Sequence, residues 1–314
     1  MRIETVALLL ASLSMTVSAQ SVDRPSLPAT PLTQPPVIDG NILEDPAWQA
    51  VTPETSFTQN TPDDGMPVSQ RTELRLAYTD DAVYVAFVCF DEEPERIIAS
   101  DARRDAGLGD VDAVRFVFDT YRDDQNGFVF GTNVNAEEWD AQLSSKGENK
   151  NWDGVWEVRT RTADHGWSAE FRIPLKTLRY PTADVQSWGA NFERRIARRH
   201  EVAFWSPLGR QFGITWLADA GTVTGLEIEK QRNLQVVPYA LGAVSDRGDE
   251  GSSTDSEFGL DVKYGITPSL TLDLTYNTDF AQVEADELQI SLDRFNLFFP
   301  EKRPFFLENS GLFS

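Results

Sequence analysis

The segment Ala82–Phe90, which reads AVYVAFVCF, carries no charged residue on either face that a strand would present. Side chains alternate between the two faces of an extended chain, so a strand with one solvated face shows polar residues at every second position. The absence of that alternation predicts a central strand that is covered on both sides. We therefore expect layers of structure above and below this segment.

The segments around this strand also have the period of strands. Helical pattern is confined to DPAWQAV and PLKTLRY, each with a Pro at a starting position and room for one or two turns. Short strands at regular spacing, separated by turn residues, are typical of an antiparallel β-sandwich, and the predicted fold class is all-β. The strand-like segments are TELRLAYT (72–79), AVRFVFD (113–119), NGFVFGTNVN (126–135), VWEVRTRT (155–162) and GWSAEFRIP (166–174).

The N-terminus has the pattern of a secretory signal peptide, which we place at residues 1–19. Arg2 precedes an apolar run, and Val17-Ser18-Ala19 supplies the small residues of a cleavage site. Residues 20–35 are rich in Pro, Ser and Thr and are predicted to be a flexible linker. The chain is thus expected to be exported to the periplasm or outer membrane of a Gram-negative bacterium.

Composition excludes several classes of function. The formal net charge is −22, with 50 acidic and 28 basic residues, and such a field repels nucleic acid. The single cysteine, Cys89, lies in an apolar run, which predicts a buried thiol and no internal disulfide. Only two histidines occur, far apart, which disfavours a histidine zinc site and a Ser-His-Asp triad.

Four motifs between residues 36 and 182 resemble, in order, the signatures of the family 9 carbohydrate-binding modules. The motifs are PPVIDGNILEDPAWQAV, YTDDAVYVAFVCFD, GDVDAVRFVFDT and GWSAEFRIPLKTL. The matching positions are Asp39, Gly40, Asp45, Ala47 and Trp48 at the start and Trp167, Glu170, Ile173 and Pro174 at the end. The resemblance implies a β-sandwich over 36–182 that binds a polysaccharide or oligosaccharide, often with structural calcium.

The predicted sugar site rests on aromatic rings beside hydrogen-bonding groups. Sugar-binding members of that family have a Trp before the Gly-Asp stretch, whereas this chain has RRDAGLGD (103–110) there, without an aromatic. Sugars need flat apolar faces for their C–H side and carboxylates or amides for their hydroxyls. Trp156 and Trp167 are expected in the core. The candidate ligand-binding residues are Trp139, Asp140, Asn151, Trp152 and Asp153.

Two acidic clusters are candidates for calcium binding, because Ca²⁺ prefers hard oxygen ligands. Asp110 and Asp112 belong to DAGLGDVD, and Asp119, Asp123 and Asp124 belong to DTYRDDQNGF. Their spacing is not that of an EF-hand. The alternative is that both are solvated turns of a strongly acidic protein.

Residues 183–233 are interpreted as a connecting region. Four arginines fall within six residues, at 194, 195, 198 and 199. They either contact anionic lipid headgroups, pair with acidic loops of the first domain, or line an exposed strand edge beside Glu193 and Glu201.

Residues 234–314 have the pattern of strands that face lipid. EFGLDVKYGITPSLTLDLTYN (257–277) alternates apolar and polar residues on both sides of a Thr-Pro-Ser turn, which predicts a hairpin. With the motifs before it and the ending FNLFFPEKRPFFLENSGLF, the chain resembles exported bacterial proteins in which a family 9-like module precedes an outer-membrane β-barrel. A barrel takes about eight strands. We count four, at 234–244, 257–266, 269–278 and 285–293, so an incomplete, antiparallel barrel-type segment of a longer protein is expected.

Three functions fit these patterns. The leading hypothesis is a non-catalytic carbohydrate-binding module of a cell-envelope protein, linked to polysaccharide breakdown or uptake. The second is a glycoside hydrolase with paired carboxylates, drawn from Glu137, Glu138 and Asp140. The third is a structural plug or cap of an outer-membrane barrel that binds no sugar.

Overall fold

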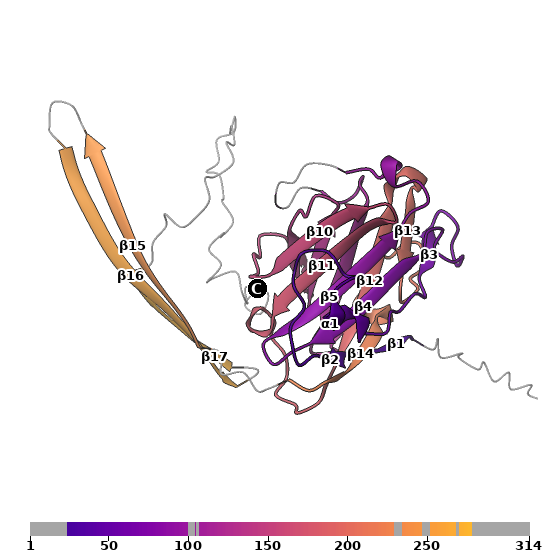
Figure 1. Ribbon diagram of the computed structural model, residues 1–314. Helices are drawn as coiled ribbons and strands as arrows, with labels where there is room; N and C mark the ends of the chain where they lie inside the picture. The colour runs from indigo at the N-terminus through magenta and orange to yellow at the C-terminus, as the bar shows by residue number, and fades with distance from the viewer. Residues whose placement is uncertain are drawn as a thin grey trace, which may run out of the picture.

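The computed structural model describes residues 24–99, 104, 107–228, 234–246, 252–267 and 270–277 (Figure 1). The predicted signal peptide and the C-terminal stretch 278–314 lie outside the described residues. The described part consists mainly of strands, with one short α-helix, α1 (Pro46–Gln49), and four single-turn 3-10 helices, η1 (Pro94–Arg96), η2 (Leu175–Thr177), η3 (Ala197–Arg199) and η4 (Leu217–Asp219). Within these ranges no helix has the length and apolar character needed to cross a membrane.

Two sheets lie face to face and form a β-sandwich, which confirms the predicted all-β fold (Figure 1). The nine-stranded sheet has the order β1 (Ser26–Pro28), β14 (Gly221–Leu226), β12 (Gln186–Ile196), β6 (Ala113–Asp119), β7 (Gly127–Asn133), β8 (Trp139–Ser144) and β9 (Gly147–Asn149), with β13 (Glu201–Phe204) on β12 and β3 (Thr58–Thr61) on β13. The five-stranded sheet has the order β10 (Glu157–Ala163), β11 (Gly166–Pro174), β5 (Ala82–Phe90), β4 (Thr72–Tyr78) and β2 (Thr30–Pro31). All pairings are antiparallel except β1 with β14 and β2 with β4.

β5 is the central strand of its sheet, as the apolar segment 82–90 predicts. Val83, Val85 and Phe87 face the core between the sheets. Tyr84 and Val88 face the other way and pack in a second cluster with Trp48 of α1. Both faces of β5 are therefore covered, and this explains why its sequence does not alternate.

Aromatic rings fill the space between the sheets. Phe116 of β6 meets Phe171 of β11 edge-on, with ring centroids 5.0 Å apart. Trp156 and Trp167 are buried in the same cluster, as predicted, and Cys89 is buried there as well. Burial raises the pKa of the Cys89 thiol to about 11. The thiol is therefore a small apolar group of the core.

The sandwich is longer than the sequence predicts. β12 lies between β6 and β14, and it pairs with β6 from Gly189 to Arg195. Strands β12, β13 and β14 thus belong to the nine-stranded sheet, although they lie within the region 183–233 that the sequence predicts to be a connection. The predicted linker at 20–35 likewise contributes β1 and β2. Glu193 and Arg194 of β12 are buried although both are charged. Their charges interrupt the apolar alternation by which a buried strand is predicted from sequence.

Three positions of the first motif, Asp39, Gly40 and Trp48, converge on one buried carboxylate, that of Glu170 in β11. Its Oε1 accepts from the indole Nε1 of Trp48 at 2.5 Å, and its Oε2 accepts from the N–H groups of Gly40 and Asp39 at 3.0 and 3.1 Å. Burial raises the pKa of Glu170, and these donors partly offset that effect. Gly40 has φ +81°, a backbone conformation that favours glycine. A Cβ at this position would lie only 2.8 Å from the backbone of Thr160, which is too close for a side chain.

The C-terminal strands form a separate three-stranded antiparallel sheet of β15 (Leu234–Asp246), β16 (Ser252–Thr267) and β17 (Leu270–Tyr276). β16 and β17 pair as the predicted hairpin, with Leu260 opposite Tyr276 and Tyr264 opposite Leu272. The fourth predicted strand, 285–293, lies outside the described residues.

We expect Glu170→Gln to lower the free energy of unfolding by about 2 kcal/mol at neutral pH, because the amide N–H₂ would face a backbone or indole donor where an acceptor is required. Denaturant unfolding of the full chain measures this. Glu157→Gln on neighbouring β10 is the matched control, since its side chain is 42% exposed and its ion pair with Arg159 is at the surface. Equal stability of the two variants would contradict the role assigned to Glu170.

Candidate functional site

One corner of the nine-stranded sheet gathers several polar side chains around Arg104. The guanidinium donates to Glu138 Oε2 and to Asp140 Oδ1, both at 2.8 Å, and it also contacts Asp153. Asp140 is fully buried, and its second oxygen accepts from the N–H of Gly154 at 2.6 Å. Asp140 thus joins β8 to the loop between β9 and β10, which contains Gly154. The side chains of Glu138 and Asp153 are 32% and 62% exposed.

Trp152 lies in the same loop and is half-buried. Its ring packs on Phe128 and Phe130 of β7, with centroid distances of 5.2 and 5.9 Å. A Cβ at position 154 would lie 2.6 Å from the Trp152 ring, so glycine at 154 allows the ring its close approach to the backbone. We call Arg104, Glu138, Asp140, Trp152 and Asp153 the Trp152 corner.

The structure brings together four of the five predicted sugar-site residues and separates the fifth. Asp140 and Asp153 share Arg104, and Trp152 and the exposed Asn151 precede Asp153 in the chain. Trp139 is buried on the opposite face of the sheet, in a cluster with Val117 and Val129. Consecutive residues of a strand point to opposite faces, so Trp139 cannot share a site with Asp140. Its inclusion in the predicted site is corrected.

Arg104 was not among the predicted site residues. The stretch RRDAGLGD matters in the sequence for its missing aromatic residue and, as part of DAGLGDVD, for its aspartates, but not for its arginines. The signal that sequence offered was a pair of arginines in a strongly acidic chain, since a cation there would find carboxylates to bind. Its partners, however, lie 34 to 49 residues away in the chain, and only the fold identifies them.

The predicted calcium ligands do not form one site. Asp110 and Asp112 precede β6, whereas Asp119 ends it, and seven strand residues span about 20 Å. The buried Asp119 carboxylate accepts from the N–H groups of Asp123 and Asp124, at 3.3 and 2.9 Å, and thereby closes the β6–β7 turn. Burial raises the pKa of Asp119. Asp110 is exposed, and across the described ranges no three acidic, His or Cys side chains are arranged to hold a metal ion.

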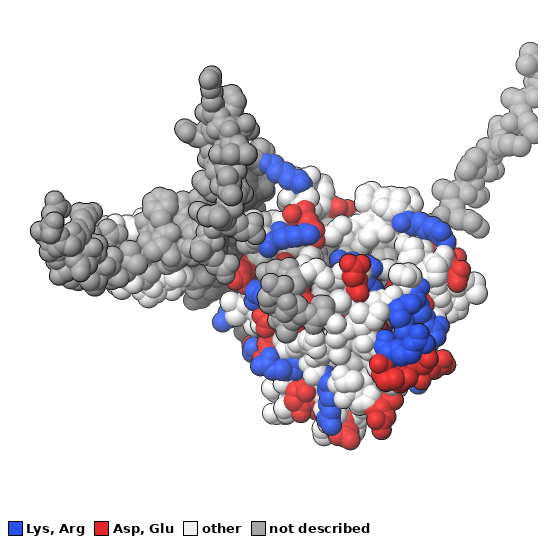
Figure 2. Space-filling model, turned by 90° about the horizontal axis from the view of Figure 1, so that it is seen from above, with Lys and Arg blue, Asp and Glu red and all other residues white. Residues whose placement is uncertain are grey.

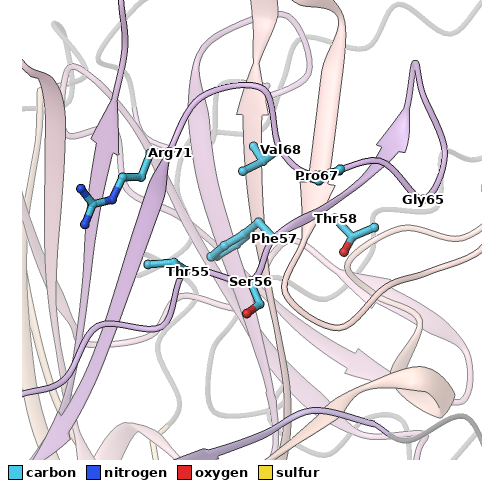
Figure 3. A pocket seen from close by; sticks show the side chains of 8 residues that line it. All are labelled: Thr55, Ser56, Phe57, Thr58, Gly65, Pro67, Val68 and Arg71. Atoms are coloured by element: carbon cyan, nitrogen blue, oxygen red, sulfur yellow. The ribbon is translucent and has the colours of Figure 1, made fainter.

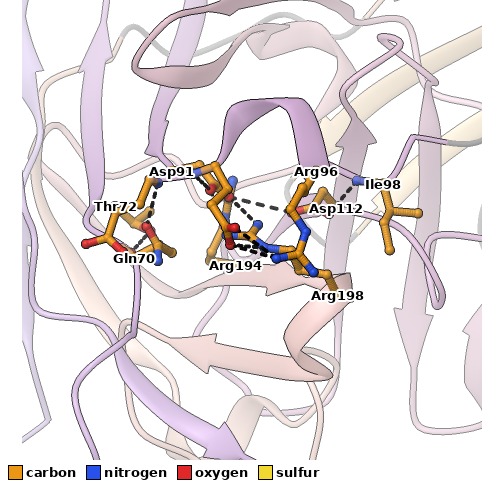
Figure 4. A network of polar contacts seen from close by, with 10 residues as sticks. Gln70, Thr72, Asp91, Arg96, Ile98, Asp112, Arg194 and Arg198 are labelled. Carbon is orange, nitrogen blue, oxygen red and sulfur yellow. Dashed lines mark hydrogen bonds and ion pairs between the residues drawn. The ribbon is translucent and has the colours of Figure 1, made fainter.

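Arg194 and Arg198 pair with acidic groups of the first region, which was one of the three alternatives for the arginine cluster (Figure 4). Arg198 binds both oxygens of Asp91, which directly follows β5, the longer contact being 2.7 Å. Burial raises the pKa of Asp91, but the hydrogen bonds from Arg198 and from the N–H of Glu93, with the charges of Arg198 and Arg194, together outweigh it, and the pKa is lowered. Arg194 is fully buried over the Trp167 ring, 3.8 Å from Asp112, whose pKa is raised by burial. These two arginines link the sheets and do not reach a lipid surface.

The carboxylates of the hydrolase alternative do not face one another. Glu137 is fully buried, and its Oε2 accepts from the side-chain amide of Asn133 at 2.7 Å. Glu138 and Asp140 are both bound by Arg104. A permanent cation therefore occupies the position between the two carboxylates where a glycosidic bond would have to lie.

An open groove of about 540 Å³ lies elsewhere on the sandwich, between the segments 55–58 and 65–71 (Figure 3). Hydroxyl groups of Thr55, Ser56 and Thr58 line it together with Arg71. Phe57 lies at its centre but is only 3% exposed. The groove offers hydrogen bonds without an aromatic surface, which makes it a weaker candidate for sugar than the Trp152 corner.

The described surface carries charges of both signs. On the face shown in Figure 2, basic side chains are interspersed with acidic ones.

Comparison with known proteins supports the fold. A family described as a domain of unknown function (DUF5916) matches residues 231–314. A candidate carbohydrate-binding protein from Bacteroides uniformis ATCC 8492 is similar over 66% of this chain and 100% of its own, with 14% identity and a TM-score of 0.54. A family 9 carbohydrate-binding module from Caldicellulosiruptor kristjanssonii, solved with cellotriose, has 17% identity over 66% of this chain and 95% of its own, with a TM-score of 0.45. No curated protein matches the chain.

Gly154→Ala should destabilise the protein by about 1–3 kcal/mol, because the added methyl overlaps the Trp152 ring. The cost should largely disappear in a Trp152→Ala background, and a double-mutant cycle by denaturant unfolding measures this coupling. Gly213→Ala is the control, since a Cβ there meets nothing within 4 Å. If the cost persisted without Trp152, the packing of the ring over Gly154 would be contradicted.

Proposed function

We propose that the sandwich is a non-catalytic glycan-binding module of an exported cell-envelope protein, and that it holds a pyranose ring at the Trp152 corner. The observation that carries the proposal is the Arg104 guanidinium, which fixes two partly exposed carboxylates, Glu138 and Asp153, the second of them next in the chain to the half-buried Trp152. Sugars bind through their C–H faces on aromatic rings and through hydroxyls that bridge charged and polar groups.

Each group at the corner has a distinct task in this proposal. Asp140 uses both oxygens on Arg104 and Gly154, so it positions the loop and does not contact ligand. Glu138 and Asp153 are partly exposed and accept from sugar hydroxyls, while Arg104, 36% exposed, donates. Because protein contacts fix these side chains beforehand, binding orders few of them and costs little entropy.

The fold likeness to a candidate carbohydrate-binding protein supports the same ligand class. Export through the predicted signal peptide at 1–19 would place the module where envelope polysaccharides are bound, broken down or taken up. A structural calcium ion stays an expectation of the family resemblance alone, since the predicted ligands do not assemble a site for it.

Trp152→Ala should weaken binding of a responsive oligosaccharide at least tenfold, which corresponds to about 1.4 kcal/mol of lost stacking. Calorimetry of the full chain with cellotriose, xylotriose and mannotriose, with and without calcium, measures the affinity. Val185→Ala is the control, since this exposed side chain lies outside the corner. Wild-type protein that binds none of the three sugars would contradict the proposal.

We also propose that the C-terminal sheet contacts the acyl chains of the outer membrane. Along Phe258–Tyr264 and the residues paired with it on β15 and β17, the register places apolar side chains on one face, and many are exposed. Its described members are Val236, Pro238, Ala240, Phe258, Leu260, Val262, Tyr264, Leu272, Leu274 and Tyr276. Phe258 is 61% exposed, Leu274 55% and Tyr276 71%. Exposed apolar faces of this extent mark an interaction surface, and strands with one apolar face suit lipid.

Leu274→Asp should reduce flotation of the full chain with phosphatidylethanolamine–phosphatidylglycerol vesicles several-fold, because a charge on the apolar face opposes insertion. Thr275→Asp is the matched control: it is the next residue of β17, exposed, and paired with Asp261 on the other face. Equal flotation of the two variants would contradict the assignment of the lipid-facing side.

A further inference from the structure

The segment 205–220, between β13 and β14, covers the outer face of the nine-stranded sheet. Leu208, Ile214 and Leu217 are buried there in one cluster with Val117 and Val129 of the sheet. Two turns fix the segment: the N–H of residue 212 donates to the carbonyl of residue 209 at 2.8 Å, and that of residue 216 to residue 213 at 2.9 Å. The segment is therefore held both by its buried side chains, which pack on the sheet, and by its own backbone hydrogen bonds.

This segment displays a pair of stacked aromatic rings. The rings of Phe212 and Trp216 have centroids 4.0 Å apart and an interplanar angle of 12°. Trp216 is 39% exposed, and its Nε1 donates to Asp219 Oδ2 at 2.9 Å. Phe212 covers one face of the indole and itself packs on the buried cluster. The exposed part of Trp216 is then its other face and its edge, held in a fixed plane.

Polar groups surround the exposed indole. Asp219 lies 3.8 Å from the guanidinium of Arg24, and both side chains are about half exposed, at 48% and 49%. Gln211 and Thr215, which precede Phe212 and Trp216 in the chain, are exposed. A single flat apolar face with hydrogen-bonding groups at its edge matches a pyranose ring. The exposed face of one indole is far smaller than the roughly 800 Å² per partner that a stable protein interface buries, so a small ligand suits it better than a protein partner.

We propose that Phe212 and Trp216 form a second glycan-binding surface, in which a pyranose ring stacks on Trp216 and its hydroxyls reach Asp219 and Arg24. The ligand class rests on the proposed function of the sandwich. The location does not, because this surface belongs to the outer-face cluster, whereas Trp152 packs on the inner-face cluster. The two surfaces therefore bind separate sugars, and the full chain takes up two short oligosaccharides.

Fluorine NMR of the full chain labelled with 5-fluorotryptophan tests both surfaces at once. The chain has 8 tryptophans, and Trp216→Phe and Trp152→Phe assign the two relevant resonances. Titration with cellotriose, xylotriose and mannotriose should shift both resonances, each with its own saturation curve. In calorimetry, Trp216→Ala should lower the stoichiometry from two to one. Tyr121→Ala, an exposed aromatic with the same 39% exposure, should leave it at two.

The outcomes separate the two proposals. If the Trp152 resonance shifts and the Trp216 resonance does not, the second surface is overturned and the Trp152 corner stands. If only the Trp216 resonance shifts, the second surface stands and the corner is overturned. If neither responds to any of the three sugars, both are overturned.

Discussion

The buried carboxylate of Glu170 is the contact on which the cover of the five-stranded sheet depends. Three donors from residues 39, 40 and 48 converge on its two oxygens, more than 120 residues away in the chain. The donors close the loop that carries α1 onto the outer face of β5. A buried charge is tolerated only when its hydrogen bonds are complete, so the loop, the helix and the strand hold one another in place.

The same use of charge recurs at the ends of the sandwich. Arg198 and Asp91 join the two sheets, and Arg104 joins β8 to the loop of Trp152. In a chain of net charge −22, each buried or half-buried arginine neutralises carboxylates that would otherwise repel one another. The ion pair of Arg198 with Asp91 is buried, so it only holds the two sheets together. At the Trp152 corner the carboxylates remain partly exposed, and the same ion pairs that hold the loop also shape a polar surface.

The sequence predicts well those features that depend on local periodicity. The central position of β5, the burial of Trp156 and Trp167, and the β16–β17 hairpin all follow from alternation or its absence. It predicts poorly what depends on partners distant in the chain. β12 contains buried Glu193 and Arg194, whose charges resemble a solvated connection until their partners are known. Trp139 and Asp140 are neighbours in the chain, yet strand parity sends them to opposite faces.

The two proposed glycan surfaces pack on the two clusters that cover opposite faces of one sheet, and this arrangement favours one kind of ligand. A trisaccharide would fill one proposed surface and gain nothing from the other, so the two would act independently. A polymer that spans both would form its second contact at the high effective concentration set by the first. Two weak sites would then retain a polymer more firmly than either site alone, while short oligosaccharides would exchange rapidly. The proposed pair of surfaces would therefore select for polymer length, which a single surface cannot do.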